Sequence, residues 1–370
     1  MALRSLPATY MRGGTSRALF FDRADLPLLQ GADTAPWDRI FCAAMGSPDP
    51  WQRQLDGMGG GITSLSKVAV IGPPTHPEAD VDYTFAQVDV TAPVVGYRGN
   101  CGNISAAVGP YALHRGLVRA EGDRACVTIH NTNTRKLIRA SFPVEAGQLA
   151  TEGDLALDGV AGNAAPIELA FPDPGGAATG RVFPTGQRQQ ELEIPGHGAV
   201  RATMIDVCNP LLILEAPDFG LVGDESAAGL ASDAGLLARL SEARCLAAAT
   251  MGLVESAEVA RKDLRNLPLV AVISRTEEAN LRVRMFSSDQ PHKASPLTGA
   301  MGLAAAAAIP GTLAHEMAQA AIGAGSFRIA HVSGVLEVAA KGEFDVPEPL
   351  VTETTVLRTA RVLMQGRVFY

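Results

Sequence analysis

The chain has 370 residues, a net charge of −8 and a pI of about 5.4, which argues against a basic surface for nucleic acid. Small anionic substrates stay open, because helix N-termini and a few arginines can outweigh the global charge. Hydrophobic residues make up 47% and charged residues 19%, so we expect an ordered chain with a sizeable core, and the length predicts two domains.

The five cysteines are few and far apart, and no two of them form a Cys-x-x-Cys pair. This pattern favours reduced thiols and a cytoplasmic protein. The seven histidines show no His-x-x-x-His spacing, so we predict no metal site and no cofactor. The first residues lack a secretory apolar segment, and no apolar run is long enough for a membrane span.

The first third of the chain alternates strand-like runs with glycine-rich loops. Residues 8–21 predict two strands around a turn at Gly13-Gly14, with Arg12, Thr15 and Ser16 beside it. Residues 37–45 predict a short helix. Residues 54–67 form a loop with glycines that can approach a ligand closely, and Lys67 ends it just before an apolar strand at 68–71.

The most informative stretch is 97–113. It follows a predicted strand at 81–90, and Gly99 and Gly102 enclose Cys101 before a run of small residues that favours a narrow helix. A cysteine in the first turn of a helix lies where backbone N–H groups and the helix dipole favour a thiolate or a bound carboxylate. Most lone cysteines are small buried hydrophobes, but the Gly-Asn-Cys-Gly-Asn setting favours chemistry.

Residues 125–144 predict a hairpin after this helix, and 182–186 a border into the second half of the chain. The second half repeats the outline of the first. It begins with an extended segment at 205–214, interrupted at 209–210, and a helix at 232–251. Strands at 269–273 and 281–286 precede a thin Gly/Ala helix at 300–309, and 355–370 is again strand-like. We interpret this as an internal duplication in which Ser295 and Thr298 stand near the position of the cysteine.

Several stretches spread over most of the chain resemble the PrpF-type isomerases, a family that includes 2-methylaconitate isomerase and the 4-oxalomesaconate isomerases and tautomerases. The matching stretches are Met-Arg-Gly-Gly-Thr-Ser at 11–16, Gly-Ser-Pro-Asp at 46–49, Asp-Gly-Met-Gly-Gly at 56–60, 63–67, Asn-Cys-Gly-Asn at 100–103 with 106–110, Pro-Thr-Gly at 184–186, Ala-Ile-Pro-Gly at 308–311 and Thr-Ala-Arg-Val at 359–362. Two positions depart from the pattern: Arg17 stands where lysine is usual, and His292-Lys293 replaces a His-rich approach to the second helix.

The resemblance implies an α+β, diaminopimelate epimerase-like fold. It would consist of two similar domains, each an antiparallel β-barrel around a central α-helix, with the active site in the cleft between them. We place the first domain at 1–183 and the second at 184–370, and the last strand, about 356–370, may return to the first domain.

The resemblance also implies cofactor-independent isomerisation of an unsaturated tricarboxylate by 1,3-proton transfer, with Cys101 and Lys67 as catalytic residues. We predict 4-oxalomesaconate as the substrate, in the breakdown of lignin-type aromatic acids, with its keto–enol tautomerisation and 2-methylaconitate isomerisation as alternatives. A homodimer and a small anionic substrate are the expected partners, without nucleic acid or membrane. The predicted substrate-binding residues are Arg12, Thr15, Ser16, Ser64, Ser66, Asn100, Gly102, Asn103, Ser295, Leu297, Thr298 and Gly299.

Other classes of protein remain open at this point. The segment 14–18 approximates a serine-nucleophile elbow but lacks its last glycine, so a serine hydrolase is a weak alternative. A non-catalytic binding protein is another. Ser64 and Ser66 could be loop hydroxyls satisfied by backbone, and Arg12 could be a solvated charge as readily as a carboxylate clamp.

Overall fold

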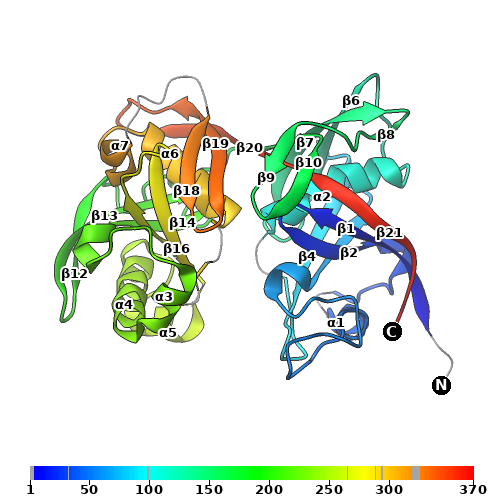
Figure 1. Cartoon of the computed structure of the whole chain (residues 1–370), viewed down its shortest axis with the longest axis horizontal. Coiled ribbons are helices and arrows are strands. Elements are labelled where there is room, and N and C mark those ends of the chain that lie inside the picture. The colour runs from blue at the N-terminus through cyan, green and yellow to red at the C-terminus, as the bar shows by residue number, and fades with distance from the viewer. Residues whose placement is uncertain are drawn as a thin grey trace. The chain divides into compact units, whose positions relative to one another are not determined.

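The computed structural model describes residues 4–31, 33–97, 100–264, 266–287, 289–292, 295–318 and 326–370 (Figure 1). Gly99 and Lys293, both used in the sequence argument, lie outside these ranges. The chain divides into two compact units, Met1–Ala170 with Leu357–Tyr370, and Phe171–Val356. We describe each unit by itself.

Unit 1 is a mixed sheet that winds around one helix. Its helices are α1 (Ala35–Met45) and α2 (Gly102–His114). Its strands are β1 (Ser5–Gly13), β2 (Ser16–Asp22), β3 (Lys67–Gly72), β4 (Val81–Val88), β5 (Val95–Gly96), β6 (Arg124–Asn131), β7 (Lys136–Glu145), β8 (Gln148–Leu149), β9 (Leu155–Leu157), β10 (Val160–Ala164), most of β11 (Ile167–Pro172), and β21 (Ala360–Phe369). The long strands pair in the order β21–β1–β2–β3–β4–β6–β7–β11.

Unit 2 is built in the same way. Its helices are α3 (Ala227–Ser232), α4 (Ala234–Thr250), α5 (Ala257–Asp263), α6 (Leu297–Ala308) and α7 (Leu313–Met317). Its strands are β12 (Gln190–Ile194), β13 (Gly198–Val207), β14 (Asn209–Glu215), β15 (Leu269–Ser274), β16 (Leu281–Ser287), β17 (Gln290–Pro291), β18 (Phe327–His331), β19 (Gly334–Glu343) and most of β20 (Leu350–Arg358). The long strands pair in the order β12–β13–β14–β15–β16–β18–β19–β20.

The two pairing orders have the same sequence of orientations, which confirms the internal duplication. In each unit the third and fifth pairs are parallel, β2·β3 and β4·β6 in one, β14·β15 and β16·β18 in the other. The prediction of purely antiparallel barrels is therefore wrong in this detail. A helical segment crosses over between the two strands of each parallel pair, and a crossover of that length permits parallel pairing.

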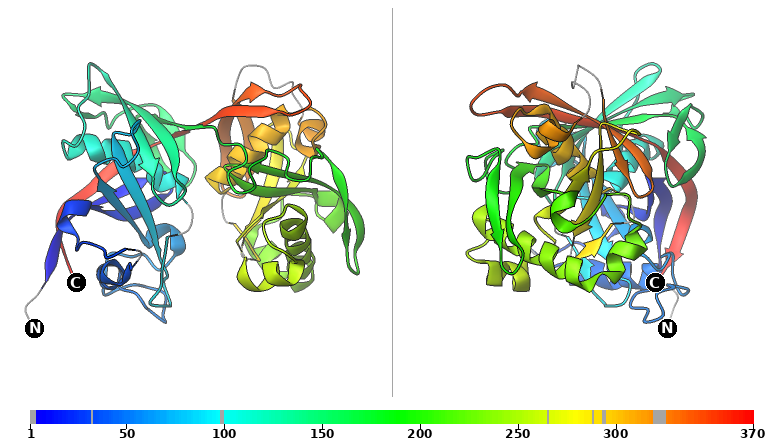
Figure 2. Two further views of the ribbon diagram at one scale, coloured as in Figure 1. Left: turned by 180° about the vertical axis from the view of Figure 1, so that it is seen from behind. Right: turned by 60° about the vertical axis from the view of Figure 1, so that its left-hand side comes forward.

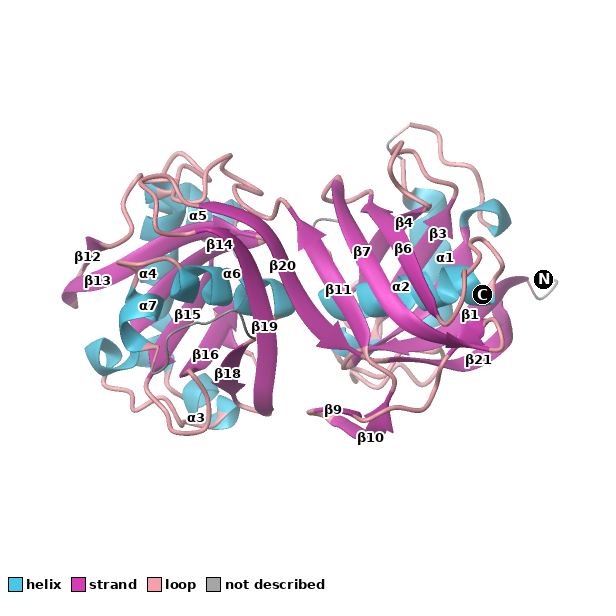
Figure 3. Ribbon diagram, turned by 90° about the horizontal axis from the view of Figure 1, so that it is seen from above, coloured by secondary structure: helices cyan, strands magenta, loops and turns pink. Residues whose placement is uncertain are grey.

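The helix inside each sheet is narrow because its residues are small. In α2, every residue from Ile104 to Leu113 is buried, and α6 is almost wholly buried as well. A Cβ on Gly109 would lie 2.8 Å from Cε1 of Phe142 on β7. Such a buried helix must be largely apolar all round, and α2 and α6 contain few polar residues. Figure 3 shows both helices in cyan among the strands.

A second layer covers the outer face of each sheet. In unit 1, Trp37 and Phe41 of α1 pack in one cluster with Leu19, Phe21 and Val70 of the sheet. In unit 2, α4 packs against β12 to β16 through leucines such as Leu236 and Leu240. Each sheet thus has an inner face toward the central helix and an outer face toward the covering helix.

The chain crosses between the units first at 170/171, before the predicted boundary, and again at 356/357, close to the predicted start of the last strand. The predicted boundary at 183/184 assigns residues 171–183 to the first domain, whereas they lie in unit 2. The last strand, β21, pairs with β1 and lies in unit 1 (Figure 2). The predicted extended segment at 205–214 is a hairpin, because the chain reverses at Cys208, whose φ is +62°.

All five cysteines are free thiols in the structure. Within the described ranges, no helix combines the length and the apolar character that crossing a bilayer requires.

The tight fit of α2 predicts that Gly109→Ala destabilises the protein, although alanine is the better helix former. The added Cβ would press on Phe142, which is fully buried, and overpacking of this kind costs about 1 to 3 kcal/mol, against about 1 kcal/mol gained in helix propensity. Chemical denaturation would measure the difference in free energy of unfolding.

Gly235→Ala on the exposed α4 start is the matched control. The nearest atoms to its added Cβ lie 3.4 Å away on flexible side chains, so we expect a change within about 0.5 kcal/mol. A Gly109→Ala protein as stable as the control would contradict the fit described here.

Candidate functional site

The β1–β2 hairpin lies directly against the first turn of α2. A Cβ on Gly13 would come within 2.4 Å of the Asn103 carbonyl oxygen, and one on Gly14, whose φ is +50°, within 2.2 Å of Asn103 Oδ1. Asn103 Nδ2 donates to Thr15 Oγ1 at 3.2 Å, and its Oδ1 accepts from Arg358 Nε at 3.2 Å. Only a glycine at position 13 permits this approach of the hairpin backbone to the Asn103 backbone.

Cys101 is the N-cap residue of α2, as the sequence predicts. Its backbone is extended, and its side chain makes no capping hydrogen bond. Its carbonyl oxygen accepts from Ser105 N at 2.9 Å and from Ser105 Oγ at 3.1 Å. The same hydroxyl lies 3.0 Å from Asn100 Oδ1, which also accepts from Asn131 Nδ2 at 3.4 Å. The half-buried Cys101 is therefore held in place by its main chain.

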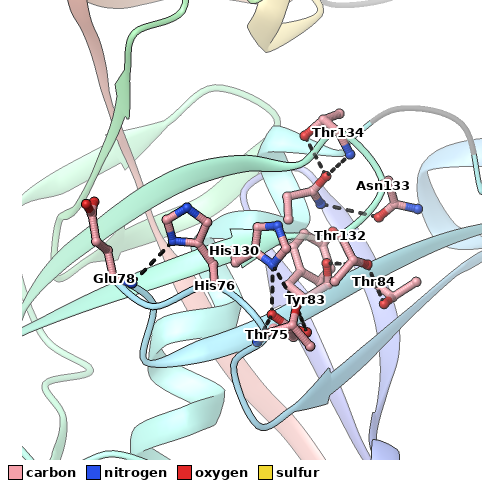
Figure 4. Close-up of polar contacts among 11 residues, drawn as sticks. Thr75, His76, Glu78, Tyr83, Thr84, His130, Thr132, Asn133 and Thr134 are labelled. Carbon is pink, nitrogen blue, oxygen red and sulfur yellow. Dashed lines mark hydrogen bonds and ion pairs between the residues drawn. The ribbon is translucent and has the colours of Figure 1, made fainter.

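A polar turn after β6 supports this segment. Thr134 donates through its N–H and its hydroxyl to Asn131 Oδ1, at 2.9 and 2.8 Å (Figure 4). Asn133 accepts from Phe85 N at 2.7 Å and donates to Tyr97 O at 2.7 Å. The turn thus joins β4 to the chain that leads into Cys101.

Tyr83 of β4 is a further buried residue that was not identified from the sequence. Its side chain is fully buried, and this burial is the main cause that raises the pKa of Tyr83 well above its usual value. The charge of Cys101 raises the pKa of Tyr83 further.

Lys67 begins β3 and points to the inside of the sheet. It is 8% exposed; its Nζ donates to Gln87 Oε1 at 2.5 Å and lies 5.1 Å from the centroid of the Phe85 ring. Gln87 Nε2 donates to Ser66 O and Thr63 O, so the orientation of the amide is fixed with its oxygen toward the lysine. The ammonium group therefore has neutral partners, and no carboxylate of the described residues pairs with it.

Lys67 lies against β4. Phe85 and Gln87 are two positions apart on one face of this strand, and both contact the lysine ammonium. Gln87 was also missed by the sequence argument. The signal for it was a lone polar residue at an inward position of an otherwise apolar alternation.

The glycine loop is folded around a buried glutamine. Gln54 Nε2 donates to Ser66 Oγ at 2.8 Å, and Gln54 Oε1 accepts from Gly61 N at 2.9 Å. Ser66 is 0% exposed, so its hydroxyl holds the loop, which favours the structural interpretation that the sequence left open. Ser64 is half-buried in the adjoining turn.

Two residues of the first hairpin also have structural contacts. Arg12 Nη1 donates to Gly14 O, Thr359 O and Thr359 Oγ1, at 2.9, 3.0 and 2.9 Å, and so ties the turn to the junction before β21. Burial lowers the pKa of Arg12, as does Arg361 opposite it. Ser16 is buried and closes the hairpin opposite Gly13.

The predicted residues of unit 2 gather at the start of α6. Asn209, just after the β13–β14 reversal, donates to Thr298 Oγ1 at 2.7 Å, which parallels the Asn103–Thr15 contact of unit 1. Ser295 Oγ is buried without a partner among the described residues, and Leu297 is buried. Gly299 leaves room for Met285, whose Cε would be 3.0 Å from an added Cβ.

The described residues contain no group of three or more His, Cys, Asp or Glu side chains that could hold a metal ion. A nearby polar cluster is saturated by its own members: buried Asp82 accepts from Thr75 N and Oγ1 and contacts His130 Nδ1 at 2.8 Å (Figure 4). It stabilises the loop before β4.

Comparison with known proteins identifies the family to which this chain belongs. The PrpF protein family model matches residues 3–370. The chain is 39% identical to the (4E)-oxalomesaconate Delta-isomerase of Novosphingobium sp. (strain KA1), with 99% of this chain and 97% of that protein covered. It is 38% identical to the 2-methyl-aconitate isomerase of Cupriavidus necator (98% and 96%) and 37% to the 3-methylitaconate isomerase of Eubacterium barkeri (98% and 97%).

Solved structures agree with the sequence comparison. A methylitaconate-delta-isomerase crystal structure superposes with a TM-score of 0.86 at 36% identity, covering 100% of this chain and 96% of that one. A hydroxyproline epimerase from Agrobacterium vitis, at 13% identity and a TM-score of 0.59, shares the fold alone, covering 100% of this chain and 92% of its own. The diaminopimelate epimerase-like fold is confirmed, and the chain belongs to the PrpF family of isomerases.

Proposed function

We propose that this isomerase moves a carbon–carbon double bond by 1,3-proton transfer in an unsaturated tricarboxylate, and that the substrate is 4-oxalomesaconate. The observations that support the proposal are the place of Cys101 as the N-cap residue of α2 and the buried ammonium group of Lys67 at the start of β3, a strand that α2 packs against. A thiolate and an ammonium group are a base and an acid that need no cofactor.

The relatives support the choice of substrate, but their percentage identities alone do not separate the candidate substrates. The Novosphingobium enzyme aligns over 370 residues, whereas the methylitaconate and methylaconitate isomerases align over 378 and 386, so fewer insertions separate it from this chain. Tautomerisation of the same acid and isomerisation of 2-methylaconitate are the alternatives. The homodimer and the role in degrading lignin-type aromatic acids stay predictions.

The proposed reaction begins with proton removal. The Cys101 thiolate takes a proton from a carbon next to the double bond, and the electron pair spreads over the alkene and the adjoining carbonyl as a dienolate. Backbone N–H groups at an uncapped helix start can stabilise such a charge.

Lys67 then completes the shift. Its ammonium group gives a proton to the carbon two positions away, the double bond moves by one bond, and the thiol and the amine return to their starting states by exchange with solvent. Gln87 accepts a hydrogen bond from the ammonium without neutralising its charge, which leaves the proton available for transfer.

The direct test is incubation of the purified protein with 4-oxalomesaconate, 2-methylaconitate and 3-methylitaconate separately, followed by proton NMR. We expect the fastest double-bond shift with 4-oxalomesaconate. Exchange of keto and enol forms without a shift would make the protein a tautomerase, and turnover of none of the acids would refute the proposed function.

We predict that Cys101→Ser lowers kcat by at least about 100-fold, because a hydroxyl is too weak an acid to supply an anionic base at neutral pH. The fold should survive, since the residue is held by its backbone. Cys126→Ser, at an exposed position, is the matched control and should turn over normally. A Cys101→Ser protein with wild-type turnover would remove this residue from the mechanism.

Solvent deuterium separates the roles of the two residues. Two proton-transfer groups acting at two carbons should place deuterium at two positions of the substrate pool in the wild-type protein. Cys101→Ser should lose exchange at the carbon that is deprotonated first. Lys67→Met should retain that exchange and lose delivery at the other carbon, as followed by NMR.

One result would contradict this mechanism of two separate proton-transfer residues. If either variant loses exchange at both positions to the same degree, one residue performs both transfers and the other only supports it.

A further inference from the structure

The residue that the proposed function leaves unexplained is Arg358, the last residue of β20. Its side chain is 5% exposed, and no carboxylate of the described residues pairs with it. Burial lowers the pKa of Arg358 to about 10. An arginine so deeply buried is ordinarily paired with an acid, because an uncompensated buried charge is costly.

The hydrogen bonds of Arg358 satisfy only part of its guanidinium. Nε donates to Asn103 Oδ1 at 3.2 Å, and Nη1 donates to Leu357 O at 2.8 Å. A guanidinium has five N–H donors, and Nη2 makes no hydrogen bond within the described part of the chain. The open edge of the group is thus suited to a planar acceptor such as a carboxylate.

The location of this charge is set by Asn103, two residues after Cys101 in the first turn of α2. Arg358 can only donate, so Asn103 must turn its oxygen to it and its NH₂ to Thr15. The Thr15 hydroxyl accepts that hydrogen bond and keeps its own proton to donate. A cation and a hydroxyl donor therefore flank the same amide, close to the proposed base.

We propose that Arg358 is a substrate-binding residue that pairs with one carboxylate of the anionic substrate, beside Thr15 and Cys101. This inference rests on the proposed function for its choice of ligand. It explains why the fold tolerates an unpaired buried charge: the bound carboxylate is the partner that the protein itself lacks. Arg12, by contrast, is occupied by the backbone and by Thr359.

The test compares wild type, Arg358→Gln, Arg358→Lys and the control Arg361→Gln, an exposed arginine three residues further on. Calorimetry would measure binding of tricarballylate, a saturated tricarboxylate that cannot react, and of glutarate and methylsuccinate, which each lack one of its carboxylates. We expect Arg358→Gln to weaken tricarballylate binding about 10- to 100-fold, the loss typical of a charge-assisted hydrogen-bonded pair.

Two further results are expected. Arg358→Gln should weaken at least one dicarboxylate less than threefold, because that ligand lacks the carboxylate that Arg358 would meet. Arg358→Lys, which keeps the charge but not the planar fork, should lose about tenfold in tricarballylate binding. Arg361→Gln should bind within twofold of wild type.

A merely structural role for Arg358 predicts the opposite pattern. It would lower the melting temperature of Arg358→Gln and leave the affinity of the folded protein unchanged. Removal of an uncompensated buried charge should instead leave the melting temperature unchanged or raise it. Equal tricarballylate binding by wild type and Arg358→Gln, or no binding by wild type, would overturn the proposal.

The result of this binding test does not depend on whether the protein turns over any of the unsaturated acids. If the wild-type protein isomerises none of the unsaturated acids, the proposed function fails, and the tricarballylate comparison still decides whether Arg358 binds a carboxylate. If it isomerises one of them and Arg358→Gln retains its KM, the function stands and this inference fails.

Discussion

The close approach of the β1–β2 hairpin to the first turn of α2 is the constraint on which the rest of unit 1 depends. Gly13 brings the hairpin backbone against the backbone of Asn103, and Gly14 lies against the Asn103 side chain, at distances that an added Cβ would not allow. Asn103 then bonds to Thr15 on one side and to Arg358 on the other. These contacts fix the start of α2 in place, and Cys101 with it. The geometry of the site therefore depends on two glycines.

Unit 2 repeats the contact between hairpin and central helix. In unit 2, Asn209 of the hairpin donates to Thr298 of the helix, with donor and acceptor exchanged between turn and helix relative to unit 1. The shared order of parallel and antiparallel pairs shows that the duplication extends to the whole sheet. The N-cap residue of α6 is Pro296, where α2 has Cys101, and β15 begins at Leu269, where β3 begins at Lys67. The two copies keep the same scaffold and differ in their chemistry.

Local signals made much of this predictable from the sequence. Alternation and paired glycines indicated the first hairpin, and small residues after Cys101 indicated a narrow helix. The partners of the polar side chains were not predictable, because they are distant in the chain: Arg358 and Asn103 are 255 positions apart, and Arg12 and Thr359 are 347. Ser66 could not be assigned to the loop either, because its partner Gln54 lies 12 positions earlier, at the other end of an irregular glycine loop.

The placement of both proposed proton-transfer groups in one unit has a stereochemical consequence. A reaction that inverts a carbon needs its base and its acid on opposite sides of that carbon. A double-bond shift has no such requirement, so both proposed groups can belong to one unit. The neutral Gln87 leaves the Lys67 ammonium its proton for transfer. Arg358, held beside the first turn of α2, keeps its charge throughout the proposed reaction.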